Sequence, residues 1–396
     1  MRLWERLTRS AETRNADASD FGRFFHHHGQ TLSGQHVSAH TAENLATVTA
    51  CVSVIASGLA SLPALVYLEQ ADGRVEAPNH PVSRLIAAPN QHQTWPDWCE
   101  WTMAQVLLHG NAISVLEYDG AGRPISLRPI PWQHVSLQLL PSGRLAYDVV
   151  SIQGQFGGTG QMRRYLEGDV VHLRDRSDDG LVGRSRISRA RDVLGNALAL
   201  QDWSSHAWSN ATTPAGAVKV PAAMSDTNFK RFSDRLRERH QGTHNARSVL
   251  ILEGGAEWQP LGMSAEDAEV LDSRKFSVEE LARLFNVPPP LVQDYTRNTF
   301  TNSGQADVWF ASRTLAPWAT KIEQEFKRTV FGPSSNYCLT IDLAGLMRGD
   351  FATRWQSYAL AVQNNILDVN EIREQEGYGP RATPPAPTQV TEAAIP

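Results

Sequence analysis

Apolar side chains recur at helical spacing along residues 187–210. They are Val193, Leu194, Ala197, Leu198, Leu200, Ala207 and Trp208, while polar side chains occupy the opposite face. Residues three and four positions apart share one face of an α-helix, so this pattern predicts a long amphipathic helix. Thr213-Pro214 ends it, because a residue that precedes proline disfavours the α region.

A second long helix is predicted from Ser264 to Asn286. The Ser264 hydroxyl is a suitable N-cap, and acidic residues follow in the first turns, where the helix dipole favours negative charge. The run Pro288-Pro289-Pro290 stops this helix. Between the two helices lie three strand patterns and a basic amphipathic helix, at residues 217–220, 248–252, 257–261 and 229–240. This order predicts a helical hairpin with a small α/β module at its tip.

Residues 294–304 have neither a helical period nor a strand alternation, which predicts a mobile loop. A helix resumes at about Gln305 and continues to Arg328. Pro317 lies inside it and is expected to bend or interrupt it, because proline lacks the N–H of the helical hydrogen bond.

The N-terminal half predicts an α+β fold. A helix ends near Ser61 and a strand starts at Ala64, and further elements follow as a helix at 95–110 and strands at 112–118, 126–128, 134–140, 145–150 and 170–173. The segment up to Ser38 is expected to be loosely ordered, and the Pro-, Ala- and Thr-rich tail from Arg381 is expected to be disordered.

Composition narrows the class of protein. The chain has 396 residues and a formal net charge of −5, which argues against a protein that coats nucleic acid. Its three cysteines, Cys51, Cys99 and Cys338, are far apart and odd in number, which favours a reducing compartment without a disulfide framework. No secretory signal follows the first residues, and no apolar run is long enough to predict a membrane span.

Catalytic motifs are absent from the sequence. It contains no G-x-x-x-x-G-K-[ST], G-x-S-x-G or H-E-x-x-H pattern. Asp175, Asp178 and Asp179 lack the spacing of an EF-hand loop and favour a polar turn over a calcium site. The adjacent His26, His27 and His28 cannot all face one ion on regular structure. The sequence therefore predicts no catalytic residue, no metal site, no cofactor and no enzymatic activity.

Several short motifs, in order, resemble one protein family. They are the helix and strand of residues 44–67, His80-Pro81 with Leu85 and Pro89-Asn90, the Leu-Leu-His-Gly-Asn-Ala run at 107–112, residues 169–173, the Asp-Gly-Leu-Val-Gly-Arg-Ser run at 179–185, and Phe-Asn-Val-Pro-Pro at 285–289. Together, over roughly residues 40–380, they are similar to the portal proteins of long-tailed bacteriophages. The similarity is greatest to the portals of gene transfer agents, phage-like particles carried by alphaproteobacteria.

The resemblance implies a portal architecture with an α+β wing, a two-helix stem, an α/β clip and a short helical crown. Its boundaries would be a flexible segment at 1–38, the wing at 39–186, stem helix 1 at 187–212, the clip at 213–262, stem helix 2 at 263–287, the tunnel loop at 291–304, the second part of the wing at 305–345, the crown at 346–380 and a disordered tail at 381–396.

The resemblance also implies partners and a location. The chain would form a homo-oligomeric ring of twelve copies at one vertex of a virion or phage-like capsid, after assembly in the bacterial cytoplasm. Double-stranded DNA would pass through it without sequence-specific contacts. The terminase large subunit and later the head-tail connector or adaptor would dock on the clip, and the major capsid protein would surround the ring. No membrane is implied.

Three groups of candidate residues follow from this reading. The tunnel loop would present Asp294, Tyr295, Thr296, Arg297, Asn298, Thr299 and Phe300 to DNA, unless it is an ordinary solvated loop. The clip helix would offer a docking surface with Lys230, Arg231, Arg235, Arg237 and Arg239, unless these form a solvated face. Intersubunit ion pairs in the stem would join Arg184, Arg186, Arg189 and Arg191 to Glu279 and Glu280 of a neighbour.

A helix-turn-helix DNA-binding protein is the alternative. Residues 276–287 resemble the first helix and turn of that motif, so a recognition helix would begin at about Pro288. The three prolines there remove backbone donors and keep the preceding residues out of the α region, which argues against it.

Overall fold

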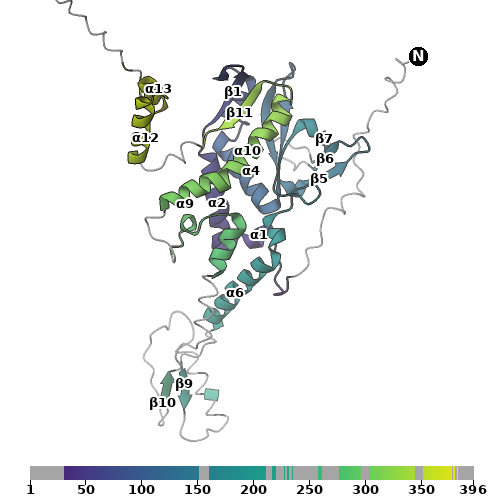
Figure 1. The fold of residues 1–396 in the computed structure, drawn as a ribbon. Helices are drawn as coiled ribbons and strands as arrows, with labels where there is room; N and C mark the ends of the chain where they lie inside the picture. The colour runs from purple at the N-terminus through teal and green to yellow at the C-terminus, as the bar shows by residue number, and fades with distance from the viewer. Residues whose placement is uncertain are drawn as a thin grey trace, which may run out of the picture.

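The computed structural model combines helices with small antiparallel sheets, which confirms the predicted α+β class (Figure 1). It describes residues 31–150, 160–210, 216–219, 257–260, 276–295, 303–343 and 351–376, and the single positions 227, 230, 231, 234, 378, 379 and 381. The histidine triplet at 26–28, the strand pattern at 248–252 and the tail beyond residue 381 lie outside the described residues.

Strand pairing in the described ranges is antiparallel throughout. In spatial order, the first sheet contains β11 (Tyr337–Ile341), β1 (Ala64–Gln70) and β2 (Gly73–Glu76). The second sheet contains β4 (Pro124–Ile130), β3 (Asn111–Tyr118) and β8 (Val170–Arg174). The third sheet contains β5 (Val135–Leu139), β6 (Leu145–Val150) and β7 (Met162–Leu166). The predicted strands of the N-terminal half are confirmed, whereas the sequence pattern does not predict β2, β7 and β11.

The described helices include α1 (Ala39–Ala42), α2 (Ala46–Ala60), α3 (Pro81–Ala87), α4 (Trp95–His109), α5 (Arg186–Arg189), α6 (Arg191–Asn210), α9 (Ser303–Phe310), α10 (Ala316–Phe326), α12 (Phe351–Gln363) and α13 (Val369–Gln375). A further helix covers residues 276–285. Single 3-10 turns lie at Trp132–His134, Glu167–Asp169 and Pro289–Val292.

Helix α4 is at the centre of the main core. Thr94 and Asp97 form a capping box at its first turn, and Gly110, with φ of 83°, ends it in the left-handed region. Its side chains Trp98, Met103 and Leu107 are at most 1% exposed and pack between α2 and the sheet of β3. Burial of each such side chain contributes about 1.5–3 kcal/mol. A second, smaller core lies between β3 and the sheet of β6.

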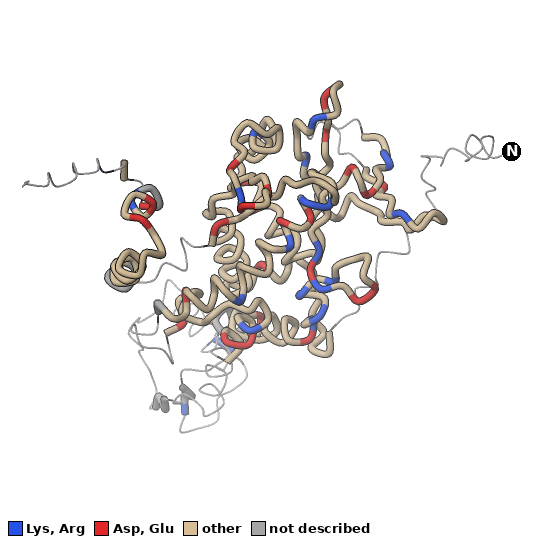
Figure 2. Tube along the Cα trace, turned by 45° about the horizontal axis from the view of Figure 1, so that its top comes forward, with Lys and Arg blue, Asp and Glu red and all other residues tan. Residues whose placement is uncertain are grey.

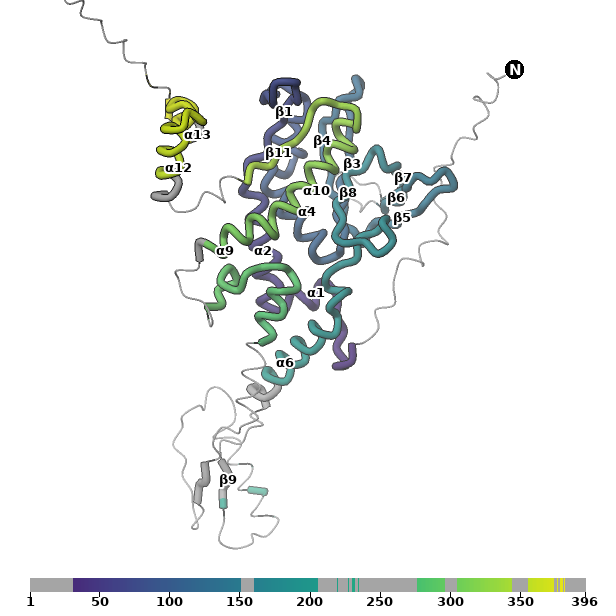
Figure 3. Tube along the Cα trace, in the orientation of Figure 1, coloured from purple at the N-terminus to yellow at the C-terminus, as the bar shows by residue number. Residues whose placement is uncertain are grey.

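The predicted first long helix is divided into α5 and α6, because Ala190 leaves helical geometry (φ −106°, ψ 33°). α6 points away from the body in Figures 1 and 3, and the strand pair β9 (Gly216–Lys219) and β10 (Glu257–Pro260) is drawn beyond its far end. The strands predicted at 217–220 and 257–261 are thus confirmed within one residue.

The third long helix continues through Pro317, and a π-helical turn directly before this proline is the departure from regular α geometry there. It passes from α9 through a π-helical turn at Ala311–Leu315 into α10, and a second π-helical turn at Lys327–Phe331 ends it. A π turn widens the helix by one residue, which accommodates the proline ring one turn later.

The segment from Thr31 to Ser38 is also ordered, contrary to the sequence prediction. Thr31 and Val37 are 6% and 3% exposed, and Ser38 caps α1. Gly195 of α6 makes the approach possible, because a Cβ there would lie 2.6 Å from the Thr31 hydroxyl. Residues 31–38 are therefore packed against the first long helix.

Helices α12 and α13 lie to one side of the body in Figure 1. Asp368 caps α13 as predicted, because its carboxylate accepts from the Asn370 N–H at 2.7 Å. Lys and Arg are interspersed with Asp and Glu along the described trace (Figure 2). Of the helices the structure describes, none combines the length and the apolar character that crossing a bilayer requires.

Candidate functional site

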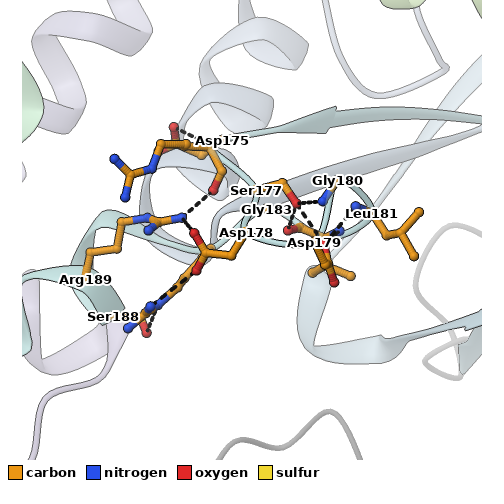
Figure 4. A network of polar contacts seen from close by, with 12 residues as sticks. Asp175, Ser177, Asp178, Asp179, Gly180, Leu181, Gly183, Ser188 and Arg189 are labelled. Atoms are coloured by element: carbon orange, nitrogen blue, oxygen red, sulfur yellow. Dashed lines mark hydrogen bonds and ion pairs between the residues drawn. The ribbon is translucent and has the colours of Figure 1, made fainter.

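The loop of residues 175–185 joins β8 to α5 and is closed by its own side chains (Figure 4). One carboxylate oxygen of Asp179 accepts from the N–H groups of Leu181 and Val182 at 2.8 and 2.9 Å. The Ser177 hydroxyl accepts from the Gly180 N–H at 2.8 Å, and Ser177 and Gly183 form an isolated bridge. The Val182 and Leu181 hydrogen bonds lower the pKa of Asp179, which keeps it ionised. This segment is the predicted polar turn.

Two other carboxylates of this loop bind arginines of the same chain. Asp178 accepts from Arg189 at 2.6 Å and from Arg184 at 3.3 Å, and these contacts, Arg189 first, lower its pKa. Asp175 binds Arg186 at 2.9 Å, with both side chains less than 20% exposed. The loop is thereby tied to the start of the first long helix.

The same loop packs backbone against backbone on the end of α4. A Cβ at Gly110 would lie 2.5 Å from the Ser185 nitrogen, and a Cβ at Gly183 would overlap the Gly110 carbonyl. Asn111 completes the contact, because its Oδ1 accepts from the Gly183 N–H at 2.8 Å and its Nδ2 donates to the Gly183 carbonyl at 2.7 Å. The sequence motifs at 107–112 and 179–185 thus meet in space.

Asn111 also connects this contact to the buried His172 of β8. Since Asn111 Oδ1 can only accept, His172 Nε2 must donate to it at 3.0 Å, and Nδ1 then accepts from the Tyr147 hydroxyl at 3.0 Å. Burial first, and then the charges of Arg174 and Arg328, hold the pKa of His172 well below its ordinary value. The ring is therefore neutral in the folded chain.

Arg186 connects the roots of the two predicted stem helices. Its guanidinium donates to the Phe285 carbonyl at 2.8 Å and approaches the Leu284 carbonyl at 3.5 Å, at the C-terminus of helix 276–285. It lies over the Phe285 and Trp318 rings, with 6.0 and 5.7 Å to their centroids. A cation at a helix C-terminus complements both the free carbonyls and the dipole.

Asn286 completes the end of helix 276–285. Its backbone is left-handed (φ 60°), and the Val287 N–H donates to the Ala282 carbonyl at 2.9 Å, as in a Schellman motif. Its side chain donates to the Arg313 carbonyl at 3.1 Å, and its own carbonyl accepts from the Thr314 hydroxyl. Contacts among Arg186, Phe285, Asn286, Arg313 and Thr314 thus bring together α5, helix 276–285 and the π turn before α10.

Comparison with known proteins decides the family of this chain. A family model described as phage portal protein matches residues 46–377. The chain belongs to the phage portal protein family. The probable portal protein of Streptomyces phage phiC31 is 30% identical over 360 residues, which cover 88% of this chain and 78% of that portal protein.

Solved structures of gene transfer agent particles contain chains that share the fold. A chain from the neck of an empty gene transfer agent particle superimposes with a TM-score of 0.63 at 24% identity, covering 87% of this chain and 92% of that chain. A chain from the neck of the native particle, solved with C12 symmetry, gives a TM-score of 0.60 at 22% identity, covering 86% and 92%. The portal resemblance found in the sequence is thus confirmed.

The helix-turn-helix alternative is not supported in this portal-family chain. After helix 276–285 the prolines form one 3-10 turn, Pro289–Val292, which ends at Gln293 with a left-handed backbone (φ 63°). No recognition helix forms in the described residues 288–295. Proline lacks a backbone N–H, so three prolines in succession argue against a helix that starts there.

The predicted DNA-contacting and docking residues are only partly within the described structure. Asp294 donates its N–H to the Pro289 carbonyl at 3.0 Å, and Tyr295 is 46% exposed. Lys230 and Arg231 are exposed positions of helical conformation. The other members, Thr296, Arg297, Asn298, Thr299, Phe300, Arg235, Arg237 and Arg239, lie outside the described residues. Both groups remain predictions.

The predicted intersubunit arginines have partners within the chain. Arg184, Arg186 and Arg189 bind the aspartates of the loop 175–185, and Glu279 pairs with Arg283 at 3.2 Å. Arg191 and Glu280 are partly buried. Ion pairs between these arginines and Glu279 or Glu280 of a neighbouring subunit remain a prediction, and they would form in addition to the contacts within the chain.

Sequence reasoning did not identify Asn111, His172, Asn286 and Thr314 as interacting residues. Only Asn286 has a local signal, because asparagine directly after a helix and before a proline run suits the left-handed C′ position. The others depend on partners that are distant in the sequence.

Proposed function

We propose that this chain assembles into a ring at one capsid vertex and provides a channel for double-stranded DNA during packaging and exit. The match to the portal family over residues 46–377 supports this most directly. The neck structure solved with C12 symmetry fits a ring of twelve copies in a virion or phage-like particle. The role is structural, with the energy for DNA movement supplied by a separate ATP-driven terminase.

The portal domains are assigned by the same proposal. The wing comprises residues 39–186 and 305–345, the stem 187–212 and 263–287, the clip 213–262, the tunnel loop 291–304 and the crown 346–380. Two observations support this assignment: Arg186, the last wing residue before the first stem segment, donates to the Phe285 carbonyl of the second stem segment, and the strands of the clip pair with each other. A chain that leaves the body on one helix and returns on another suits an insert at the tip.

Weak binding of DNA is a requirement for such a channel. Phosphate contacts release counterions and bind DNA tightly, so a wall with few cations lets the duplex slide. The net charge of −5 supports this. Arg297 and Phe300 are proposed to face the lumen. Particles with Arg297→Ala or Phe300→Ala should package or retain less DNA, measured as protected genome per particle, and normal amounts would count against the proposal.

Docking of the terminase and then of the connector is proposed for the clip. The basic helix with Lys230, Arg231, Arg235, Arg237 and Arg239 would face acidic surfaces of these partners, and charge complementarity would accelerate their association. Charge reversal at Arg235 and Arg239 should reduce binding of the purified terminase large subunit. Binding and packaging at wild-type levels would exclude this surface.

The experiment that tests the function is complementation in the producing cell. Deletion of the gene should abolish DNA-filled particles, and expression of this chain in trans should restore them. Full packaging in the deletion strain would contradict the portal function.

A further inference from the structure

Pro317 supplies no N–H to the turn that precedes it, which contains the Arg313 carbonyl and in which the Ala316 N–H donates to the Ala311 carbonyl in π register. In an α-helix the carbonyl of residue 313 accepts from the N–H of residue 317, which proline lacks, and the proline ring crowds that carbonyl. The π turn at Ala311–Leu315 relieves the crowding. The Nδ2 group of Asn286 lies 3.1 Å from the Arg313 carbonyl oxygen and donates to it.

Asn286 is held in place at both its backbone and its side chain. Its N–H donates to the Arg283 carbonyl at 3.1 Å, and its carbonyl accepts from the Thr314 hydroxyl. Thr314 is 3% exposed, and Phe285 and Leu315 are fully buried on either side of the contact. Two hydrogen bonds in opposite directions therefore join the end of helix 276–285 to the widened turn before α10.

We propose that Asn286 is a positioning residue whose amide replaces the N–H missing at Pro317 and thereby fixes helix 276–285 against the α9–α10 helix. The inference rests on the proposed function in one respect: only in a portal ring would this contact hold two segments near the channel in the same relative position in every subunit. The hydrogen bonds themselves lie within a single chain. The proline would weaken an isolated helix, but here the Arg313 carbonyl, one turn before it, accepts a hydrogen bond from a second helical segment.

Hydrogen exchange on the full-length chain tests the replacement. Asn286→Gly removes the amide and keeps the left-handed backbone, which glycine adopts without strain. Loss of this solvent-exposed hydrogen bond should accelerate amide exchange across residues 303–316 about threefold. Pro317→Ala restores the N–H, so the same Asn286→Gly change in a Pro317→Ala background should alter exchange less than twofold.

A matched control exists at the end of α12. Asn365 has φ of 53°, its N–H donates to the Val362 carbonyl, and the Ile366 N–H donates to the Ala361 carbonyl, as at Asn286. Asn365→Gly should leave exchange at 303–316 unchanged. Equal exchange in wild type and Asn286→Gly, or equal acceleration with and without Pro317, would overturn the inference. A wild-type chain that forms no ring would instead overturn the proposed function and leave this result intact.

Discussion

His172 is a fully buried residue whose imidazole ring accepts one hydrogen bond and donates another. Its neighbours define its tautomer, since Asn111 can only accept at Nε2 and Tyr147 then donates to Nδ1. The charged groups around it are Arg174, Arg328 and Glu325, which accepts the His172 backbone N–H at 2.9 Å. A proton on Nδ1 would make the Tyr147 hydroxyl accept this hydrogen bond instead of donating it, and would add a buried charge near two arginines.

This environment predicts acid sensitivity. The pKa of His172 is well below its ordinary value in the folded chain, so below about pH 6.5 only the unfolded chain binds this proton. The free energy of unfolding should therefore fall as the pH drops below that value, by up to about 1.4 kcal/mol per pH unit for one proton. Urea titrations between pH 5 and 7.5 measure it. His172→Gln should reduce the pH dependence of the free energy of unfolding by the contribution of one proton. The contributions of His80 and His109, whose pKa values burial also lowers, should remain.

Gly110 is a position at which a methyl group should be costly. Ala there needs a left-handed backbone, which costs about 1–2 kcal/mol, and its Cβ would meet the Ser185 nitrogen. Gly122 is the matched control, because its φ is 76° and nothing lies within 4 Å of a Cβ. Gly110→Ala should lower the free energy of unfolding by about 1–3 kcal/mol more than Gly122→Ala in denaturant titrations. Equal losses would show that the loop is not packed there.

Residue roles were predictable from the sequence only where the signal is local. The polar turn at 175–180 and the Asp368 cap follow from neighbouring residues, and both are confirmed. The partner of Arg186 is 99 positions away, and His172 meets Asn111 across 61. Such contacts depend on the tertiary fold, which spacing along one chain does not encode.

At the scale of elements, the loop 175–185 should depend on Asp179 more than on Asp178. Asp179 satisfies two backbone N–H groups, whereas Asp178 forms half-exposed ion pairs, which contribute little. Asp179→Ala should reduce the free energy of unfolding by about 1–2 kcal/mol, measured by thermal or urea unfolding. Asp178→Ala should change the free energy of unfolding little, because the Arg189 guanidinium still donates to the Arg176 carbonyl at 2.8 Å. The reverse order would mean that the arginines, not the turn, stabilise the loop.

The strands that sequence patterns do not predict share a physical cause. All four residues of β2 are exposed. β7 contains two consecutive arginines, Arg163 and Arg164, so its sequence lacks the alternation of apolar and polar residues that predicts a strand. Arg164 of β7 is nevertheless 8% exposed, because it binds Asp148 of β6 at 2.6 Å. β11 pairs with β1 across more than 260 residues. All three exist through pairing with a neighbouring strand rather than through their own alternation.

The long helix through Pro317 gives the same lesson for helices. Intrinsic propensity places a bend or a break at an interior proline. The structure keeps the helix with a π turn and an external donor from Asn286. Neither compensation is visible in the local sequence, although Asn286 itself is in a recognisable C′ position.

At the scale of the whole molecule, the order of the elements could be predicted from the sequence, whereas most of the contacts between them could not. The first long helix, the strand pair beyond it and an α+β body all follow from periodicity, and the family follows from short motifs in a fixed order. Of the second predicted long helix the structure describes residues 276–285, and the predicted start at Ser264 lies outside the described residues. Contacts between subunits could not be predicted, because a helical face does not reveal whether its partner is the same chain. The loop aspartates already bind Arg184, Arg186 and Arg189 within one chain.

Cryo-electron microscopy of the purified full-length chain would show directly whether it assembles as a portal. We expect closed rings with a central hole, of about twelve subunits, in which α6 and helix 276–285 run side by side along the axis and β9–β10 lies at the narrow end. Monomers without rings, or rings in which these two helices lie far from the hole, would contradict this expectation.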